Sequence, residues 1–342
     1  MKRKLLALTA ILLVLTVTFG GCENIMLIPG KSSGAIADDS SSSQNSEPLS
    51  AYPVTLNNTE ITKAPEKIVS LTPAYTEILF EMGYGKKITA VSDYCDYPEI
   101  VKELPKAASS ANPDIAAIKK LKPDLVITAT PIVTKDKISL EAQGIKVLVI
   151  PSPRNIEEFE NVYKFFGLAM NGQFDGEAAG EKAFTPIKKQ LDAIKRTDKK
   201  FIYVTAANTP AGGDTFESAV LSLFGTNIAE SSSGYSYKAA DLADNQPDII
   251  FVSDTIGEDT LTANENYSDL KAVKDGKITV LKNKYFERPS GRITELIGTA
   301  AKAFGVDPSD KAEPENSSAP ASESENSSNT QNSSKEDSKA TE

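Results

Sequence analysis

The sequence predicts an α/β fold in which two similar lobes are joined by a helical connector. Short apolar runs alternate with stretches of helical periodicity from about residue 53 to residue 306, and these runs form one series in each half. Buried strands separated by helices are typical of parallel βαβ units. A stretch of about 250 residues is long enough for two domains of ordinary size.

The predicted first lobe covers residues 53–174. Its apolar runs predict buried strands at 67–71, 87–92, 124–129 and 146–150. A helix is predicted over 72–83, because Thr72 is a capping residue type and Pro73 suits the first helical position.

The connector is predicted over residues 175–198. Its apolar positions fall at helical spacing, at Ala183, Ile187, Leu191 and Ile194. A proline within a helix removes a hydrogen bond, so Pro186 predicts a bent helix. A helical connector resists wide hinge motion, so the cleft between the lobes is expected to open only slightly.

The predicted second lobe covers residues 199–306, with strands at 200–206, 248–254 and 277–283 and a helix after Ser290. Two of its segments echo the first lobe. DNQPDIIFVSD at 244–254 resembles KLKPDLVIT at 120–128, and GKITVL at 276–281 resembles GKKITAV at 85–91. The echo favours two lobes of one plan, although Pro-Asp before a strand is also a common start signal.

The first residues have the pattern of a bacterial lipoprotein signal. Residues 1–21 contain a basic start, an apolar run and FGG directly before Cys22, which is the expected lipidation site. The alternative is an ordinary secretory signal with an incidental cysteine. The first interpretation predicts a lipid-anchored protein on the extracytoplasmic face of the cell membrane.

Residues 22–52 and 307–342 flank the lobes and are rich in Ser, Asn and acidic residues, which predicts a disordered tether and a disordered acidic tail. The formal net charge is −10, and no basic patch stands out. Nucleic acid is therefore excluded as a partner, because that affinity depends on Lys and Arg. No coiled-coil pattern is present, so a monomer is expected.

The composition also argues against an enzyme. The chain has no histidine, which excludes Ser-His-Asp and Cys-His catalysis and histidine-containing zinc sites. Neither a GxxxxGK[ST] loop nor a GxGxxG fingerprint occurs. No catalytic residue, metal site or resident cofactor is predicted.

Ligands of open α/β sheets gather at the carboxyl ends of the strands. The loops expected at those ends contain Tyr75, Tyr94, Tyr285 and Arg288, which are the candidate ligand-binding residues. Arg288 could instead form a local salt bridge, because an acidic residue precedes it.

Five segments together resemble one known family. They are KIVSLTPAYTEILFEMG, VSDYCDYP, LKPDLVI, GIKVLVI and KNKYFERPSGRI. They are similar to the periplasmic binding proteins for cobalamin, haem and iron-siderophores, and most of all to the cobalamin binders. The resemblance implies two Rossmann-like lobes joined by a single long helix, the class III arrangement. It also implies a small-molecule ligand between the lobes and delivery to the permease and ATPase subunits of an ABC importer.

Carried over by position, Tyr94 and Arg288 match corrinoid-contacting residues of that family, and Tyr75 falls in a turn that lines the cleft. Ser110 and Ala129 stand where the cobalamin binders have tryptophans. The loss of stacking area leaves both a corrinoid and an iron-siderophore open as ligands. The absence of histidine disfavours haem.

Members of the family carry one exposed glutamate on each lobe for docking to the permease. Ala116 and Ser222 occupy those positions here, and Asp114 and Glu217 are the nearest acids. Either these two acids serve for docking, or the chain is a ligand-sensing or scavenging lipoprotein that does not serve transport.

Overall fold

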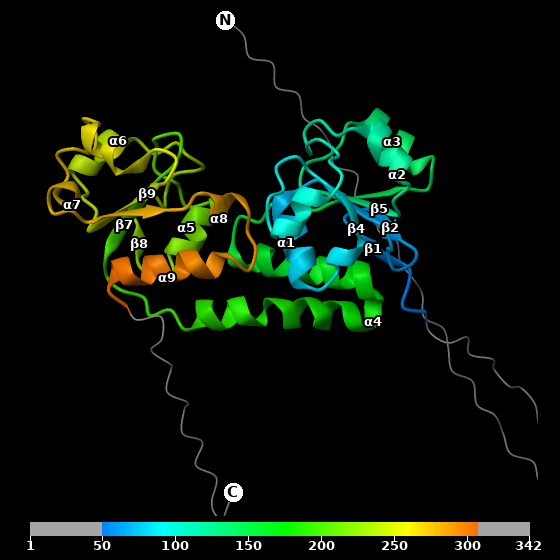
Figure 1. Cartoon of the computed structure of the whole chain (residues 1–342). Helices are drawn as coiled ribbons and strands as arrows, with labels where there is room; N and C mark the ends of the chain where they lie inside the picture. The colour runs from blue at the N-terminus through cyan, green and yellow to red at the C-terminus, as the bar shows by residue number, and fades with distance from the viewer. Residues whose placement is uncertain (1–49, 307–342) are drawn as a thin grey trace, which may run out of the picture. The chain divides into compact units, whose positions relative to one another are not determined.

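The computed structural model describes residues 50–306, which form two lobes with a four-stranded parallel sheet in each (Figure 1). The predicted α/β class and its two lobes are confirmed. The predicted signal with Cys22, most of the predicted tether and the predicted acidic tail lie outside the described residues. No helix within residues 50–306 has both the length and the apolar character needed to cross a membrane.

The first lobe opens with an antiparallel hairpin and continues with alternating strands and helices. Its strands are β1 (Val54–Leu56), β2 (Thr59–Ile61), β3 (Ile68–Ser70), β4 (Ile88–Val91), β5 (Leu125–Thr128) and β6 (Lys146–Val149). Its helices are α1 (Pro73–Glu81), α2 (Ile115–Leu121) and α3 (Thr134–Glu141), with short 3-10 turns η1 (Gly85–Lys87) and η2 (Glu99–Glu103).

After α4 (Ile156–Asp192) the second lobe follows the same alternation. Its strands are β7 (Lys200–Val204), β8 (Thr226–Asn227), β9 (Ile249–Ser253) and β10 (Ile278–Leu281). Its helices are α5 (Phe216–Leu221), α6 (Gly257–Ala263), α7 (Lys271–Lys274), α8 (Lys284–Glu287) and α9 (Ile293–Phe304), with the 3-10 turn η3 (Ala239–Ala243). All seven strands that the sequence predicts in the two lobes are present, and β1, β2 and β8 were not anticipated.

The two sheets have the same strand order. The first runs β4-β3-β5-β6 and the second β8-β7-β9-β10, so in each lobe the first strand lies between the second and the third. By this order β5 corresponds to β9, as the Pro-Asp echo suggests. The other echo is wrong, because GKKITAV forms the second strand of its sheet whereas GKITVL forms the fourth. The counterpart of GKITVL is β6.

The aspartate of each Pro-Asp pair has the same local function. Asp124 accepts hydrogen bonds from the backbone amides of Glu66 and Lys67 at 2.6 and 2.8 Å, directly before β3. Asp248 accepts one from the amide of Lys200 at 2.7 Å, where β7 begins. Each carboxylate thus satisfies amides at the start of the neighbouring strand, which explains why the motif recurs.

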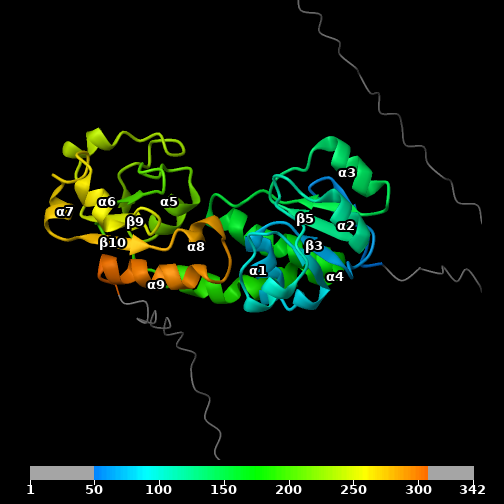
Figure 2. The same cartoon turned by 45° about the horizontal axis from the view of Figure 1, so that its top comes forward.

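Each sheet is covered on both faces. Alternate strand residues point to opposite faces, so Val126 and Val147 pack against α2 and α3 while Leu125 and Leu148 pack on the side of α1 and α4. The second sheet has α6 and α7 on one face, and α5 and α9 on the other. Figures 1 and 2 show these layers from two directions.

The connector differs from its prediction in where it bends. The only non-helical residue within α4 is Gly172, with φ 77° and ψ −173°, whereas Pro186 lies inside a continuous helix. Glycine takes positive φ at no steric cost, so the chain reverses there. Residues 156–171 pack closely against residues 173–192. A Cβ on Gly167 would lie only 2.0 Å from the Gly176 carbonyl oxygen, which shows how near the two helical segments approach.

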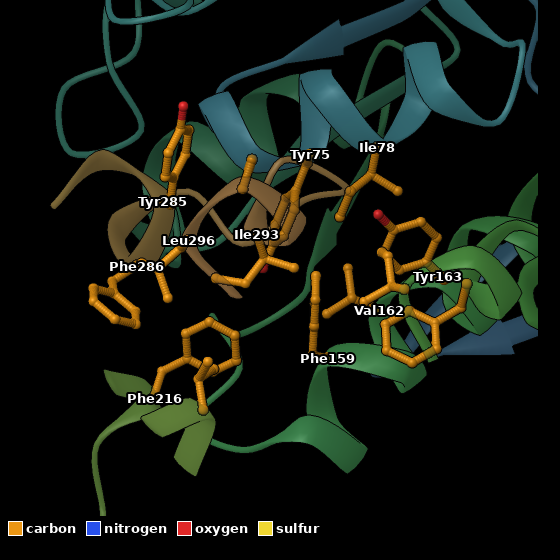
Figure 3. Packing of buried hydrophobic residues seen from close by; sticks show 14 of the residues in the cluster. Tyr75, Ile78, Phe159, Val162, Tyr163, Phe216, Tyr285, Phe286, Ile293 and Leu296 are labelled. Carbon is orange, nitrogen blue, oxygen red and sulfur yellow. The ribbon is translucent and has the colours of Figure 1, made fainter. Parts of the chain in front are cut away.

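Large side chains from both lobes meet in one cluster beside α4 (Figure 3). Phe159 makes edge contacts with Phe184 at 5.2 Å and with Phe216 of the second lobe at 5.6 Å between ring centroids. Tyr75 contacts Phe166 in the same way at 5.4 Å. This shared core fixes the edges of the space between the lobes.

Candidate functional site

A cavity of about 400 Å³ lies between the two lobes. Its first wall is Ser152–Arg154, the loop that follows β6. Its second wall comes from the second lobe, and the lining residues there are Asp214, Thr215, Phe216, Glu217, Tyr235, Phe286, Glu287 and Pro289. All these loops follow the carboxyl ends of parallel strands, where ligands of open α/β sheets bind.

A larger cavity of about 570 Å³ is less suited to a ligand. It is lined by Thr197–Lys199, Pro247–Ile249 and residues near α7, all of the second lobe. These residues lie at the amino ends of β7 and β9, opposite the end at which such sheets bind ligands. A third cavity, of about 490 Å³, also contacts both lobes, but apart from Tyr97 and 291–292 its lining comes from the helices α1, α4 and α9. The cavity of about 400 Å³, whose lining follows the carboxyl ends of strands in both lobes, is therefore the candidate site.

The second wall combines aromatic rings with a hydroxyl donor. Phe216 and Phe286 are buried, whereas Tyr235 is 49% exposed. The Tyr235 hydroxyl donates to Glu217 Oε1 at 3.1 Å. Burial, and secondly the negative charge of Glu217, raise the pKa of Tyr235 to about 12. Tyr235 thus stays a neutral donor at physiological pH.

Carboxylates dominate the polar part of the same wall. Asp214 accepts a hydrogen bond from Ser233 Oγ at 2.6 Å, which lowers its pKa. Glu287 accepts one from Asn283 Nδ2 at 2.6 Å, and the Asn283 side-chain oxygen accepts from Tyr203 at 2.9 Å. The chain from Tyr203 through Asn283 holds the Glu287 carboxylate in a fixed orientation.

Two predicted ligand-binding residues lie on loops that follow the carboxyl ends of β4 and β10. Tyr94, beyond the end of β4, is 66% exposed and is not among the residues that line the cavity between the lobes. Arg288 follows α8, and its guanidinium donates to Asp96 Oδ1 of the first lobe at 2.5 Å. The local salt bridge considered for Arg288 is therefore wrong, because the ion pair that Arg288 forms joins the two lobes and does not involve Glu287.

The other two are placed differently from the expectation. Tyr75 is 1% exposed, and its hydroxyl donates to the Ile150 carbonyl oxygen. Tyr285 is 5% exposed, and its hydroxyl donates to Glu295. Both belong to the buried cluster of Figure 3, where helical turns direct their rings inward. They support the walls of the site and do not face a ligand.

The two acids expected at the docking surface occupy different environments. Asp114 is exposed and caps α2, where it accepts from the Ala117 amide at 2.9 Å. Glu217 lies in the first turn of α5 and lines the cavity between the lobes. Its place is therefore on the ligand side of the second lobe. Ala116 is exposed on α2, and Ser222 ends α5.

A polar contact between the lobes was missed by the sequence reasoning. Glu77 on α1 is bound by Arg292 Nη1 at 2.9 Å and by Ser290 Oγ at 2.6 Å. One turn later, Glu81 accepts from the Gly291 amide at 2.9 Å and from the Tyr163 hydroxyl at 2.6 Å. Two acids on the otherwise apolar helix 73–81 were the available signal. Residues 50–306 contain no group of three or more metal-ligating acids or cysteines placed to hold an ion.

Comparison with known proteins agrees with this architecture. The model of the periplasmic binding protein family matches residues 68–285. A Bacillus subtilis protein described as an uncharacterized ABC transporter substrate-binding lipoprotein is 26% identical, over 89% of this chain and 98% of its own length. The vitamin B12-binding protein of Vibrio campbellii is 26% identical, over 74% of this chain and 95% of its own.

Solved structures share the fold. A possible iron-binding protein of Staphylococcus epidermidis superposes with a TM-score of 0.60 at 24% identity, over 71% of this chain and 99% of that one. The vitamin B12-binding protein of Vibrio cholerae gives a TM-score of 0.58 at 23% identity, over 70% and 97%. The family match covers well over half of the sequence, from β3 to α8. The chain therefore belongs to the periplasmic binding protein family.

Proposed function

We propose that this protein is the substrate-binding lipoprotein of an ABC importer, which takes up a corrinoid or an iron-siderophore between its lobes. The observation that carries the proposal is a cavity lined by carboxyl-end loops of both sheets. Relatives named as a substrate-binding lipoprotein and as vitamin B12-binding proteins support it. The proposed role is binding and delivery without turnover of the ligand.

In this proposal Cys22 carries the lipid that anchors the protein on the extracytoplasmic face of the membrane. The lobes then present their loaded cleft to the permease, and the ATPase drives release and import. Asp114, exposed at the start of α2, is the proposed docking acid of the first lobe. Labelling cells with a radioactive fatty acid checks the anchor, because Cys22→Ser is expected to abolish incorporation and to release the protein.

Titration calorimetry of residues 23–342 tests the ligand class. The panel contains cobalamin, haem, a ferric hydroxamate and a ferric catecholate. Saturable one-to-one binding of a corrinoid or a ferric siderophore, with the ligand recovered unchanged, supports the proposal. Failure of the whole panel to bind, or chemical conversion of a bound member, contradicts it.

One observation favours a second candidate, a ligand-sensing or scavenging lipoprotein without transport. Ala116 and Ser222 stand at the family's docking positions, and Glu217 lines the cavity and is not free on an outer face. Uptake of the identified ligand by cells that lack the gene, and by cells complemented with it, separates the two. Uptake restored by the wild type but lost with Asp114→Ala supports transport, whereas uptake independent of the gene favours the second candidate.

A further inference from the structure

The cavity between the lobes has an unbalanced charge. Asp214, Glu217 and Glu287 all belong to its second wall. Their partners are a serine hydroxyl and a backbone amide for Asp214, the Tyr235 hydroxyl for Glu217 and the Asn283 amide for Glu287. Within residues 50–306 no lysine or arginine nitrogen lies within 4.0 Å of any of these carboxylates. Three negative charges thus have only neutral partners.

The basic residues near the cavity already form ion pairs with other acids. Arg154 is the one basic residue in the lining, and its guanidinium pairs with Glu158 of its own lobe at 3.2 Å. Arg288, at the rim, pairs with Asp96 at 2.5 Å. An anionic ligand would approach three carboxylates of like charge, and the exposed Arg154 is the one cation that it would meet in the lining. A cation meets no such repulsion.

The remaining lining also suits a cation. Phe216, Tyr235 and Phe286 bring aromatic rings to the same wall. The faces of such rings attract a positive group, the more so when water is partly excluded. Tyr235 is the exposed ring among the three, so carboxylates and one accessible aromatic ring share the wall that a cationic group on an apolar body would contact.

We propose that the cleft selects a ligand with net positive charge, a cationic corrinoid or a ferric complex that bears a protonated amine, over neutral and anionic members of the same classes. This inference rests on the proposed function. It specifies in addition that the part of the ligand facing the second lobe is positively charged.

Matched ligand pairs test the charge alone. Aquocobalamin carries one more positive charge than cyanocobalamin. Ferrioxamine B loses its positive amine on N-acetylation. Titration calorimetry of residues 23–342 with all four is expected to give tighter binding of the cationic member of at least one pair by about tenfold, or ~1.4 kcal/mol.

Variants then assign the preference to the wall. Glu217→Gln and Glu287→Gln keep the size of the side chain and remove its charge. Each variant is expected to lower the affinity for the cationic ligand about tenfold. Its affinity for the neutral member of the same pair is expected to stay within about twofold of the wild type. Asp244→Asn is the matched control, because Asp244 is an exposed acid before β9, at the opposite end of the sheet. Thermal melts verify that each variant is folded.

Each remaining outcome counts against the inference. Equal or tighter binding of the neutral members by the wild type overturns the charge preference and leaves the proposed function standing. A loss that is the same for both members of a pair also overturns it, because the acids would then act through shape. Absence of binding by all four probes overturns the inference together with the corrinoid and siderophore assignment.

Discussion

Arg292 and Glu77 form a buried ion pair that joins the two lobes. Their side chains are 13% and 2% exposed, and Nη1 lies 2.9 Å from Oε1. Ser290 satisfies the second oxygen of Glu77, and the Arg292 guanidinium also lies over the ring of Tyr97 at 4.3 Å. The pair restricts relative movement of the lobes at the base of the cleft. It agrees with the expectation of limited opening, which stays a prediction.

Removing one partner of this pair is expected to destabilise the protein. Arg292→Ala leaves Glu77 as an uncompensated buried charge, a change that costs about 3 to 5 kcal/mol in comparable sites. Urea unfolding measures the free energy. Arg154→Ala is the control, because that side chain is 74% exposed and its pair with Glu158 is worth under about 1 kcal/mol. Equal effects of the two variants would contradict a structural role for the buried pair.

Glu81 should make stability depend on pH. Burial raises the pKa of Glu81 above its ordinary 4.5, although hydrogen bonds from Tyr163 and Gly291 act in the opposite direction. A carboxyl with a raised pKa in the folded state binds its proton more tightly there than in the unfolded chain, so its contribution falls as pH rises above 4.5. Glu81→Gln should therefore gain stability relative to the wild type between pH 4.5 and 7. Melting temperatures across that range check the sign, and a difference that is constant with pH would refute it.

The helical hairpin within α4 should not tolerate side chains on its glycines. A Cβ on Gly176 would lie 2.4 Å from the Cα of Leu168, so Gly176→Ala is expected to destabilise by about 1 to 3 kcal/mol in spite of its better helix propensity. Gly298 on α9 has nothing within 4 Å of its Cβ position. Gly298→Ala should therefore be neutral or stabilising by up to about 1 kcal/mol. Calorimetric melts of the two variants show whether packing or helix propensity has the larger effect at each position. If both variants were stabilised, the close contact between Gly176 and Leu168 would be excluded.

Substitution of Tyr94 and of Tyr75, both predicted from the sequence to bind the ligand, should affect different properties: ligand affinity for Tyr94 and stability for Tyr75. If Tyr94 contacts the ligand as the family resemblance implies, Tyr94→Ala is expected to lower ligand affinity about tenfold with an unchanged melting temperature, because the ring is exposed on the loop after β4. Tyr75→Ala removes a ring that is 1% exposed and should cost about 3 to 5 kcal/mol of stability. Binding and melting measured on both variants decide the matter. The opposite pattern would place Tyr75 in the ligand site.

The sequence was sufficient for the strands but not for the direction of side chains. Apolar runs such as DLVITA mark a buried strand wherever they occur, because burial on both faces leaves no alternation. Tyr75 and Tyr285 were misjudged because a loop beside a strand end and the first turn of a helix look alike in sequence, yet both residues lie in the first turn of a helix on its buried face. The bend at Gly172 was missed because Pro186 is the stronger local signal, although the close approach of two helix segments needs glycine.

Contacts between distant segments were beyond the sequence. Asp96 and Arg288 are 192 residues apart, and only the folded lobes bring them together. Glu217 is a second example. It is close in sequence to the predicted docking position Ser222, but its side chain lines the cavity between the lobes. Local pattern predicts which elements form, whereas the cavity is a property of how two lobes meet.

The proposed ligand binds between the lobes, at the carboxyl ends of both sheets. Hydrogen–deuterium exchange of residues 23–342, measured with and without the tightest ligand of the panel, locates the bound ligand along the chain. We expect slower exchange of amides at Ser152–Arg154 and across Asp214–Glu217, one segment from each lobe. Protection confined to Thr197–Lys199 and its neighbours around the 570 Å³ cavity, or to one lobe alone, would contradict it.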